Sequence, residues 1–198
     1  MASIKTVCVF CGSSRGARPE YAATANALGR EIARRGMTLV YGAGNIGLMG
    51  VLADAALAEG GVVIGVIPES LVAWEVAHSG LTELHIVRSM HERKAMMADR
   101  ADAFIALPGG MGTFEELCEI LTWAQLGLHR KPCALWNIAG YYDPFIVLLD
   151  NAVGERFLCP EHRALLLTES SHEPTRVLQR LAEYVMPSVD KFIDRDQT

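Results

Sequence analysis

The sequence predicts an α/β protein with a single Rossmann-like domain, in which a parallel sheet is flanked by helices. Short apolar runs of strand length alternate with amphipathic segments of about three helical turns, which is the pattern of repeated βαβ units. Glycine-rich turns stand where several of these runs pass into a helix. A chain of 198 residues has room for one sizeable core. We therefore expect a single Rossmann-like domain over residues 1–189 and a frayed polar tail over 190–198.

The expected elements alternate in order along the chain. Strands are expected at residues 6–10, 37–41, 62–67, 84–87, 103–107, 133–137 and 164–168. Helices are expected at residues 19–35, 48–58, 90–99, 114–127, 144–153 and 174–186. Pro19 suits a first helical turn, Gly36 a C-cap and Ser89 an N-cap. Between residues 68 and 85 the pattern weakens, which predicts a loop or a broken helix over the mouth of the sheet.

The most informative stretch is PGGMGTFEE at residues 108–116, which follows the central apolar run. Three glycines within four positions let the backbone turn tightly, and the helix that begins there adds the positive end of its dipole. A phosphate would bind well at such a turn. The stretch is neither a Walker A loop nor a G-x-G-x-x-G dinucleotide loop. A structural alternative stays open, because Thr113 and Glu116 also have the T-x-x-E spacing of a capping box.

Residues 108–116 resemble the P-G-G-x-G-T-x-x-E signature of the LOG family, the cytokinin riboside 5'-monophosphate phosphoribohydrolases, whose members were often mislabelled lysine decarboxylases. YGAGNIGLMG at 41–50 is similar to the family's Y-G-G-G-x-x-G-L-M-G, and MHERK at 90–94 is similar to its M-H-x-R-K. The three motifs occur in the family's order. Ala43 departs from the usual glycine, so a positive φ or a close backbone approach at this position would make its methyl group matter.

The resemblance implies a hydrolase that cleaves the N-glycosidic bond of adenosine 5'-monophosphates, N6-modified or plain, to the free base and ribose 5-phosphate. Glu116 and Arg93 would be the catalytic pair, since a carboxylate can stabilise an oxocarbenium-like ribose and activate water. The phosphate would rest on Gly109, Gly110, Gly112 and Thr113. The substrate site would consist of Glu75, Lys94, Gly110, Met111, Gly112, Thr113, Phe114, Glu115 and Thr122. The resemblance implies no cofactor.

Composition argues against several other classes of function. A net charge of −5 without a Lys/Arg stripe does not suit a nucleic-acid partner. No apolar run is long enough to span a bilayer, and the chain starts without a secretory signal, so we expect a cytoplasmic protein. Five cysteines fit a reducing compartment, and Cys8 and Cys11 point to opposite faces of a strand, unlike a redox pair. No histidine spacing predicts a metal site.

Two other functions stay open at this point. A non-catalytic nucleotide-binding or carrier module of the same fold would bind AMP without releasing adenine. A lysine decarboxylase would hold pyridoxal phosphate as a Schiff base, for which Lys94 is the only lysine near the expected site. Arg93 has its own structural alternative, a solvated helix face shared with charged neighbours. Apolar residues on more than one face of the helices at 90–98 and 114–126 predict a homodimer or larger assembly.

Overall fold

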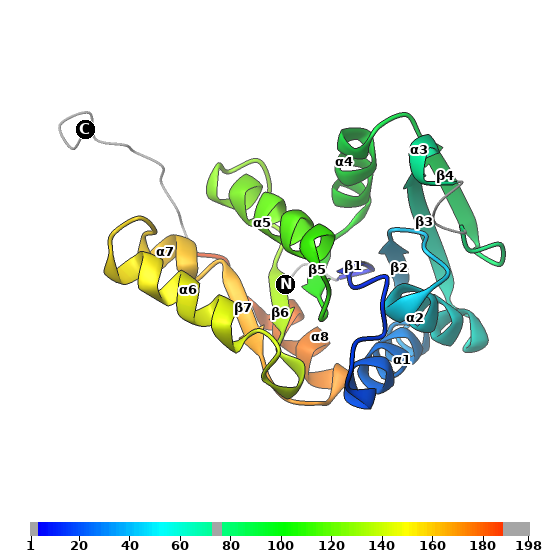
Figure 1. Ribbon diagram of the computed structural model, residues 1–198, viewed down its shortest axis with the longest axis horizontal. Coiled ribbons are helices and arrows are strands. Elements are labelled where there is room, and N and C mark those ends of the chain that lie inside the picture. The colour runs from blue at the N-terminus through cyan, green and yellow to red at the C-terminus, as the bar shows by residue number, and fades with distance from the viewer. Residues whose placement is uncertain (1–3, 73–76, 188–198) are drawn as a thin grey trace.

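The computed structural model describes residues 4–72 and 77–187 of the chain. They form one seven-stranded sheet whose neighbouring strands all pair in parallel, with helices on both faces (Figure 1). The strands are β1 (Thr6–Phe10), β2 (Thr38–Tyr41), β3 (Val62–Pro68), β4 (Glu83–Val87), β5 (Ala103–Ala106), β6 (Cys133–Trp136) and β7 (Leu166–Glu169). The predicted α/β fold is confirmed, and the predicted tail at 190–198 lies outside the described residues.

Two groups of helices cover the two faces of the sheet. One face packs against α1 (Pro19–Arg34), α2 (Gly47–Ala58) and α8 (Pro174–Glu183), and the other packs against α4 (Met90–Arg100), α5 (Met111–Gln125) and α6 (Asp143–Gly154). The short elements are α3 (Glu69–Val72), the 3-10 turn η1 (Ile138–Gly140) and α7 (Pro160–Arg163). Burial on both faces explains why the strands read as continuous apolar runs. None of the helices in the two described ranges is long and apolar enough to cross a bilayer.

The order in which the strands are added to the sheet reverses at its centre, beside β1. The strand order is β4-β3-β2-β1-β5-β6-β7, so the chain moves outward from β1 to β4 and then returns through α4 to place β5 on the other side of β1. Val7 accordingly pairs with Leu39 on one side and with Ala103 on the other. The connections that leave the carboxyl ends of β1 and β5 diverge, which opens a crevice between them. A ligand is expected at this point.

The first turn of α5 differs from the predicted one. The helix begins at Met111 instead of residue 114, and Gly110 is its N-cap, in an extended conformation. Thr113 therefore lies inside the helix, so the capping-box interpretation of Thr113 and Glu116 is wrong. Gly109 makes the early start possible, because a Cβ at this position would lie 2.1 Å from Thr113 Oγ1. Glu116 has no role in capping this helix.

Other boundaries differ less, and the predicted N-cap of α4 is confirmed. Ser89 Oγ accepts the N–H of Glu92 at 3.1 Å. β7 begins two residues later than expected, because the N–H of Leu165 still donates to a carbonyl of α7. α8 ends at Glu183 instead of 186, and Pro187 disfavours helical backbone just beyond that end.

Candidate active site

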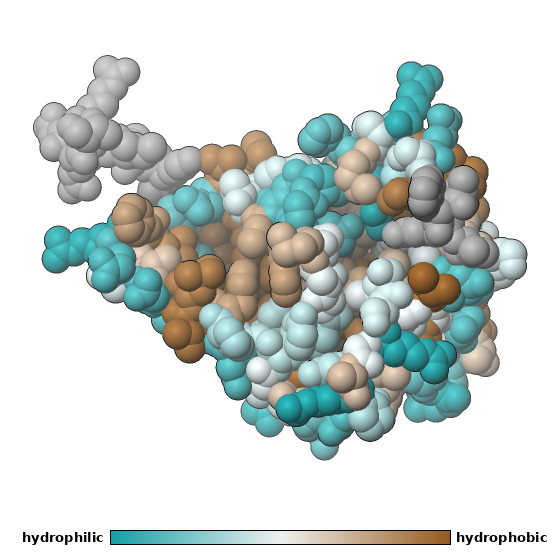
Figure 2. All heavy atoms as spheres, viewed as in Figure 1, coloured by the Kyte–Doolittle hydropathy of each residue, from teal (hydrophilic) through white to brown (hydrophobic). Residues whose placement is uncertain are grey.

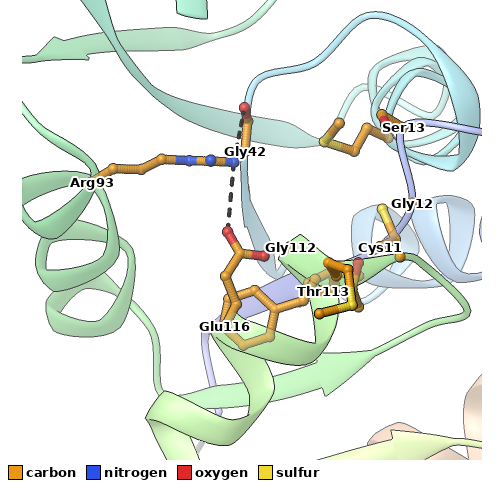
Figure 3. Close-up of a pocket in the computed structure, with 13 residues that line it drawn as sticks. Cys11, Gly12, Ser13, Gly42, Arg93, Gly112, Thr113 and Glu116 are labelled. Atoms are coloured by element: carbon orange, nitrogen blue, oxygen red, sulfur yellow. Dashed lines mark hydrogen bonds and ion pairs between the residues drawn. The ribbon is translucent and has the colours of Figure 1, made fainter. Parts of the chain in front are cut away.

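A cavity of about 190 Å³ opens at the carboxyl ends of β1, β2 and β5, where the strand order changes direction (Figure 3). Its walls come from the end of β1, from the loops after β1, β2 and β5, and from helices α2, α4 and α5, which are far apart in the sequence. The main polar contributors are Gly12 and Ser13 after β1, Gly42 after β2, Arg93 on α4, and residues 110–113 and Glu116 on α5. The structure therefore brings both predicted catalytic residues and most of the predicted phosphate-binding turn into one cavity.

Arg93 and Glu116 point toward each other across this cavity (Figure 3). Arg93 Nη2 lies 3.6 Å from Glu116 Oε1, which is an ion pair longer than a hydrogen bond. Only 9% of the Arg93 side chain and 12% of the Glu116 side chain are exposed. The interpretation of Arg93 as part of a solvated helix face is therefore wrong. An arginine at this depth supplies a permanent positive charge opposite the carboxylate.

Backbone carbonyls hold the Arg93 guanidinium in place. Its Nε donates to the carbonyl of Val66 at 3.2 Å, and its Nη2 donates to that of Gly42 at 3.4 Å. Gly42 has to be a glycine in this arrangement, because a Cβ there would lie 2.0 Å from Arg93 Nη2. Backbone carbonyls of the protein itself therefore position the guanidinium, and no ligand is needed for this.

The N-terminal turn of α5 is open to an anion. Among residues 4–72 and 77–187 no side chain caps it, and Phe114 is the first residue of the turn whose N–H reaches a helical acceptor, Gly110 O at 3.1 Å. The N–H groups of residues 111–113 have no acceptor within the helix. A Cβ on Gly110 or Gly112 would meet no atom within 4 Å, so the space beside this turn is free. Unpaired N–H groups at the positive end of a helix dipole favour a phosphate.

A second cavity of about 250 Å³ adjoins the first and shares Gly12, Ser13 and Gly110 with it. Its walls include the rings of Tyr21 and Tyr141, which pack edge to face with their centroids 5.8 Å apart. The first cavity alone is small for a nucleotide, but the two together reach the usual size of a small-molecule site.

Thiol and metal chemistry have little support in this site. Cys11 lines the cavity, but burial raises the pKa of its thiol far above the ordinary value, and the Glu116 carboxylate raises it further. Burial and then Glu116 likewise raise the pKa of Cys8, which packs in the core on the opposite face of the sheet, as predicted. Protonated thiols are poor nucleophiles. Within the described residues no group of three His, Cys, Asp or Glu side chains could hold a metal ion.

Two predicted substrate residues lie beside the cavity without lining it. Lys94 follows Arg93 on α4, but its Nζ donates to the carboxylate of Glu115 and, at 3.0 Å, to that of Glu119. Both carboxylates are on α5. Lys94 is 7% exposed, so this contact is buried at its centre. The three residues form a bridge between the two helices next to the Arg93–Glu116 pair.

The remaining predicted residues are more widely spread. Phe114 packs against the ring of Tyr142, with the two centroids 6.1 Å apart. Thr122 lies farther along α5, where it donates to the Cys118 carbonyl and lines a different cavity, between α5 and α6. The structure of this single chain does not bring Thr122 to Glu116. Glu75 lies outside the described residues.

Ala43, the departure from the family's motif, does adopt a left-handed backbone, with φ of 62°. Its methyl group is fully buried and faces Gly65, where an added Cβ would come within 2.7 Å of it. A left-handed alanine costs about 1 kcal/mol, and burying one methyl group returns a similar amount. The loop therefore accommodates the alanine at little net cost, while Gly65 leaves the room that its methyl group needs.

Sequence reasoning missed three contributors to this region. Met49 lines the first cavity from α2, although an apolar residue in an apolar helix predicts only core packing. Tyr141 lines the second cavity and donates to the carbonyl of Gly109, and no pattern in the sequence indicates this contact. Glu119 does have a signal, since it lies one helical turn after Glu115 and therefore on the same face.

Comparison with known proteins gives a consistent picture. The family model described as "Possible lysine decarboxylase" matches residues 49–181. A cytokinin riboside 5'-monophosphate phosphoribohydrolase from Rhodococcoides fascians is 54% identical over 164 residues, which cover 82% of this chain and 83% of that protein. A protein of the same name from Arabidopsis thaliana is 47% identical over 191 residues, or 96% of this chain and 87% of that protein.

Solved structures share the fold at much lower sequence identity. A molybdenum cofactor binding protein from Rippkaea orientalis aligns with a TM-score of 0.67 and 21% identity, covering 93% of this chain and 100% of that one. The molybdenum cofactor carrier protein from Chlamydomonas reinhardtii aligns with a TM-score of 0.66 and 19% identity, covering 90% and 98%. At such identities the likeness establishes the Rossmann-like fold alone.

Proposed function

Because the chain belongs to the LOG family, as the family match and relatives at about 50% identity establish, we propose that it hydrolyses cytokinin riboside 5'-monophosphates. Water cleaves the N-glycosidic bond between the ribose and the N6-modified adenine, which releases the free base and ribose 5-phosphate. The observation that carries this proposal is the buried Arg93–Glu116 pair in a cavity beside an uncapped helix N-terminus.

The 5'-phosphate binds the N-terminal turn of α5 in this proposal. Gly110 and Gly112 leave room for it, and the N–H groups of residues 111–113 donate to its oxygens. Glu116 lies one helical turn farther along α5, so a ribose attached to this phosphate falls beside its carboxylate. A nucleoside lacks the phosphate and loses this anchor.

Glu116 has two tasks in the reaction. Positive charge develops on the ribose as the bond from C1' to the base nitrogen breaks, and the carboxylate stabilises that charge. Glu116 also accepts a proton from the water whose oxygen bonds to C1', while the departing base keeps the electron pair of the broken bond and takes up a proton. Arg93 orients the carboxylate from the opposite wall.

Two alternatives have less support. A lysine decarboxylase needs a lysine for its Schiff base, and no lysine is among the described residues that line either cavity. Lys94, the candidate in the sequence, is engaged by two carboxylates instead. A nucleotide carrier remains distinguishable by experiment, because it would bind AMP and return it unchanged.

The decisive experiment is incubation with AMP and with isopentenyladenosine monophosphate, each beside its nucleoside, with chromatography of the products. We expect free base and ribose 5-phosphate from the monophosphates and little turnover of the nucleosides. AMP that binds in calorimetry but releases no base would identify a carrier. Equal turnover of AMP and adenosine would contradict the role given to the phosphate.

The substitution Glu116→Gln tests the chemical role of the carboxylate. Glutamine keeps the size of the side chain but removes its charge, so we expect the rate to fall about a hundredfold or more. The melting temperature should shift only by what the ion pair with Arg93 contributes, since Glu116 does not cap α5. Glu161→Gln on α7, an exposed glutamate outside both cavities, is the matched control. An active Glu116→Gln variant would return this residue to a structural role.

We also propose that the protein is a homodimer that buries the exposed apolar face of α5 and α6. α6 is rich in apolar residues, yet none of them is buried. Val147 and Leu148 remain 66% and 60% exposed, and Leu128 just after α5 and Phe157 just after α6 are exposed as well. Figure 2 shows hydrophobic residues gathered over this part of the molecule. A second copy of the same face would cover it with matching apolar surface.

The remaining partners and the location follow from the composition. The net charge of −5 gives no support for a nucleic-acid partner, so the proposed ligand is a single nucleotide. All five cysteines are free, which fits a reducing compartment and supports a cytoplasmic location. The proposed reaction uses only the substrate, water and groups of this chain.

A further inference from the structure

Three ion pairs connect α4 with α5. Arg93 pairs with Glu116 inside the cavity, and the next residue, Lys94, pairs with Glu115 and Glu119 outside it. Lys94 lines neither the first nor the second cavity. The lysine is nevertheless more deeply buried than most charged residues, with 7% of its side chain exposed. Such burial requires a structural or catalytic reason.

The charges on α5 depend on this lysine. Glu115 and Glu119 are one turn apart on the same face, and like charges at this spacing destabilise a helix. Glu119 is only 23% exposed, and its Oε2 has no hydrogen-bond partner in the part of the chain that the structure describes. Burial alone would lower the pKa of Lys94, but hydrogen bonds to Glu115 and Glu119 raise it above its ordinary value. Lys94 therefore stays charged and compensates both carboxylates.

The bridge also limits the separation of the catalytic pair. Arg93 Nη2 and Glu116 Oε1 are 3.6 Å apart, which is longer than a hydrogen bond, so Arg93 attracts the carboxylate without fixing the distance between them. Lys94 makes closer contacts, at 3.0 Å to Glu119 and with Glu115. Because Lys94 follows Arg93 on α4 and Glu115 precedes Glu116 on α5, these contacts join the two helices directly beside the reacting groups.

We propose that Lys94 is a positioning residue, whose ion pairs with Glu115 and Glu119 hold α5 against α4 so that Glu116 faces Arg93 and the substrate. This role rests on the proposed function. It differs from the role that the family resemblance implies for Lys94, which is contact with the substrate. A shift of Glu116 by about 1 Å is enough to lower the rate by about a hundredfold.

The test compares Lys94→Met with the wild type in kcat, in KM and in AMP affinity by calorimetry. We expect kcat to fall about tenfold to a hundredfold, with KM and AMP affinity changed less than about threefold. The same substitution in a Glu115→Gln/Glu119→Gln background should have much less effect, because its partners are already neutral. Lys94→Arg should recover part of the rate, since arginine can pair with the same carboxylates.

Lys131→Met is the matched control for loss of a lysine at α4. Lys131 Nζ donates to the carbonyl of Ala98 at 2.7 Å, at the other end of the helix. We expect Lys131→Met to lower the melting temperature and to leave kcat unchanged. If Lys94→Met behaves in the same way, its role is only structural and the proposal is wrong. A large loss of AMP affinity in Lys94→Met would show direct contact with the substrate and would also overturn it.

A measurement without catalysis separates this inference from the proposed function. Arg93→Met and Glu116→Gln should shift the melting temperature non-additively in the wild type, because the two residues interact. In the Lys94→Met background the two shifts should become additive. Coupling that persists there would refute the positioning role, whereas an inactive wild type with the expected loss of coupling would refute only the hydrolase.

Discussion

A substitution at Gly112 tests the proposed phosphate site directly. A Cβ at Gly112 meets no atom within 4 Å, so Gly112→Val should fold normally. The isopropyl group would fill the space beside the N-terminal turn of α5, and we expect AMP affinity to be lost. Calorimetry measures this directly. Gly154→Val, at another helical glycine with equally open space, is the control and should bind AMP as the wild type does.

AMP binding that survives in a folded Gly112→Val variant would place the phosphate elsewhere. The glycine turn and the helix that follows it could be predicted from the sequence, because both are local properties. The partners of Lys94 could not, since Glu115 and Glu119 meet it only through the packing of α4 against α5. Residue identities thus predicted two charged residues that meet in the cavity, Arg93 and Glu116, but not the contacts that hold α4 against α5.

The connection between β7 and α8 contains a buried carboxylate whose charge matters for stability. Glu169 Oε2 accepts from Arg180 Nη1 at 2.7 Å, and Oε1 accepts the N–H of Ser171 at 2.7 Å. Burial alone would raise the pKa of Glu169, but these hydrogen bonds lower it from its ordinary value of 4.5 to about 2. The unfolded chain therefore binds a proton at this group at higher pH than the folded protein does.

The ionised Glu169 thus makes its full contribution to the free energy of unfolding above pH 4.5, and this contribution is lost as the pH falls toward 2. In Glu169→Gln we expect a lower free energy of unfolding at neutral pH, by an amount on the order of 3 kcal/mol. Urea unfolding between pH 6 and 2.5 should show the difference from the wild type shrinking with acidity. Glu183→Gln on α8, whose exposed carboxylate accepts from Gln179 Nε2, should track the wild type. A difference that stays constant with pH would contradict the prediction.

Most elements could be predicted because a parallel sheet buried on both faces leaves uninterrupted apolar runs between glycine turns. The ends of the elements were less predictable, as two of the chain's Ser/Thr-x-x-Glu sequences show. Ser89 with Glu92 forms a real cap, whereas Thr113 with Glu116 does not. The difference lies in Gly109, which lets the helix start before Thr113. The spacing of Thr and Glu in the sequence does not reveal that a glycine nearby leaves room for an earlier helix start.

The assembly of the whole molecule gives a further test, by sedimentation at micromolar concentration. We expect a species of twice 21.6 kDa for the wild type. Leu148→Asp should give the monomer, because it places a charge in the proposed apolar interface. Val185→Asp, at a still more exposed apolar residue just after α8, should remain dimeric. A wild type that sediments only near 21.6 kDa would reject the dimer.

The central place of β1 has a consequence for the growing chain on the ribosome. Val7 finds its partner in β2 soon after synthesis, but its second neighbour, Ala103, is made 96 residues later. At about 5–20 residues per second, β1 waits about 5–20 s for β5. During that interval an apolar strand has one unpaired edge, which is open to pairing with other chains. The topology that creates the ligand crevice thus also makes β1 the part of the nascent protein that most needs shielding.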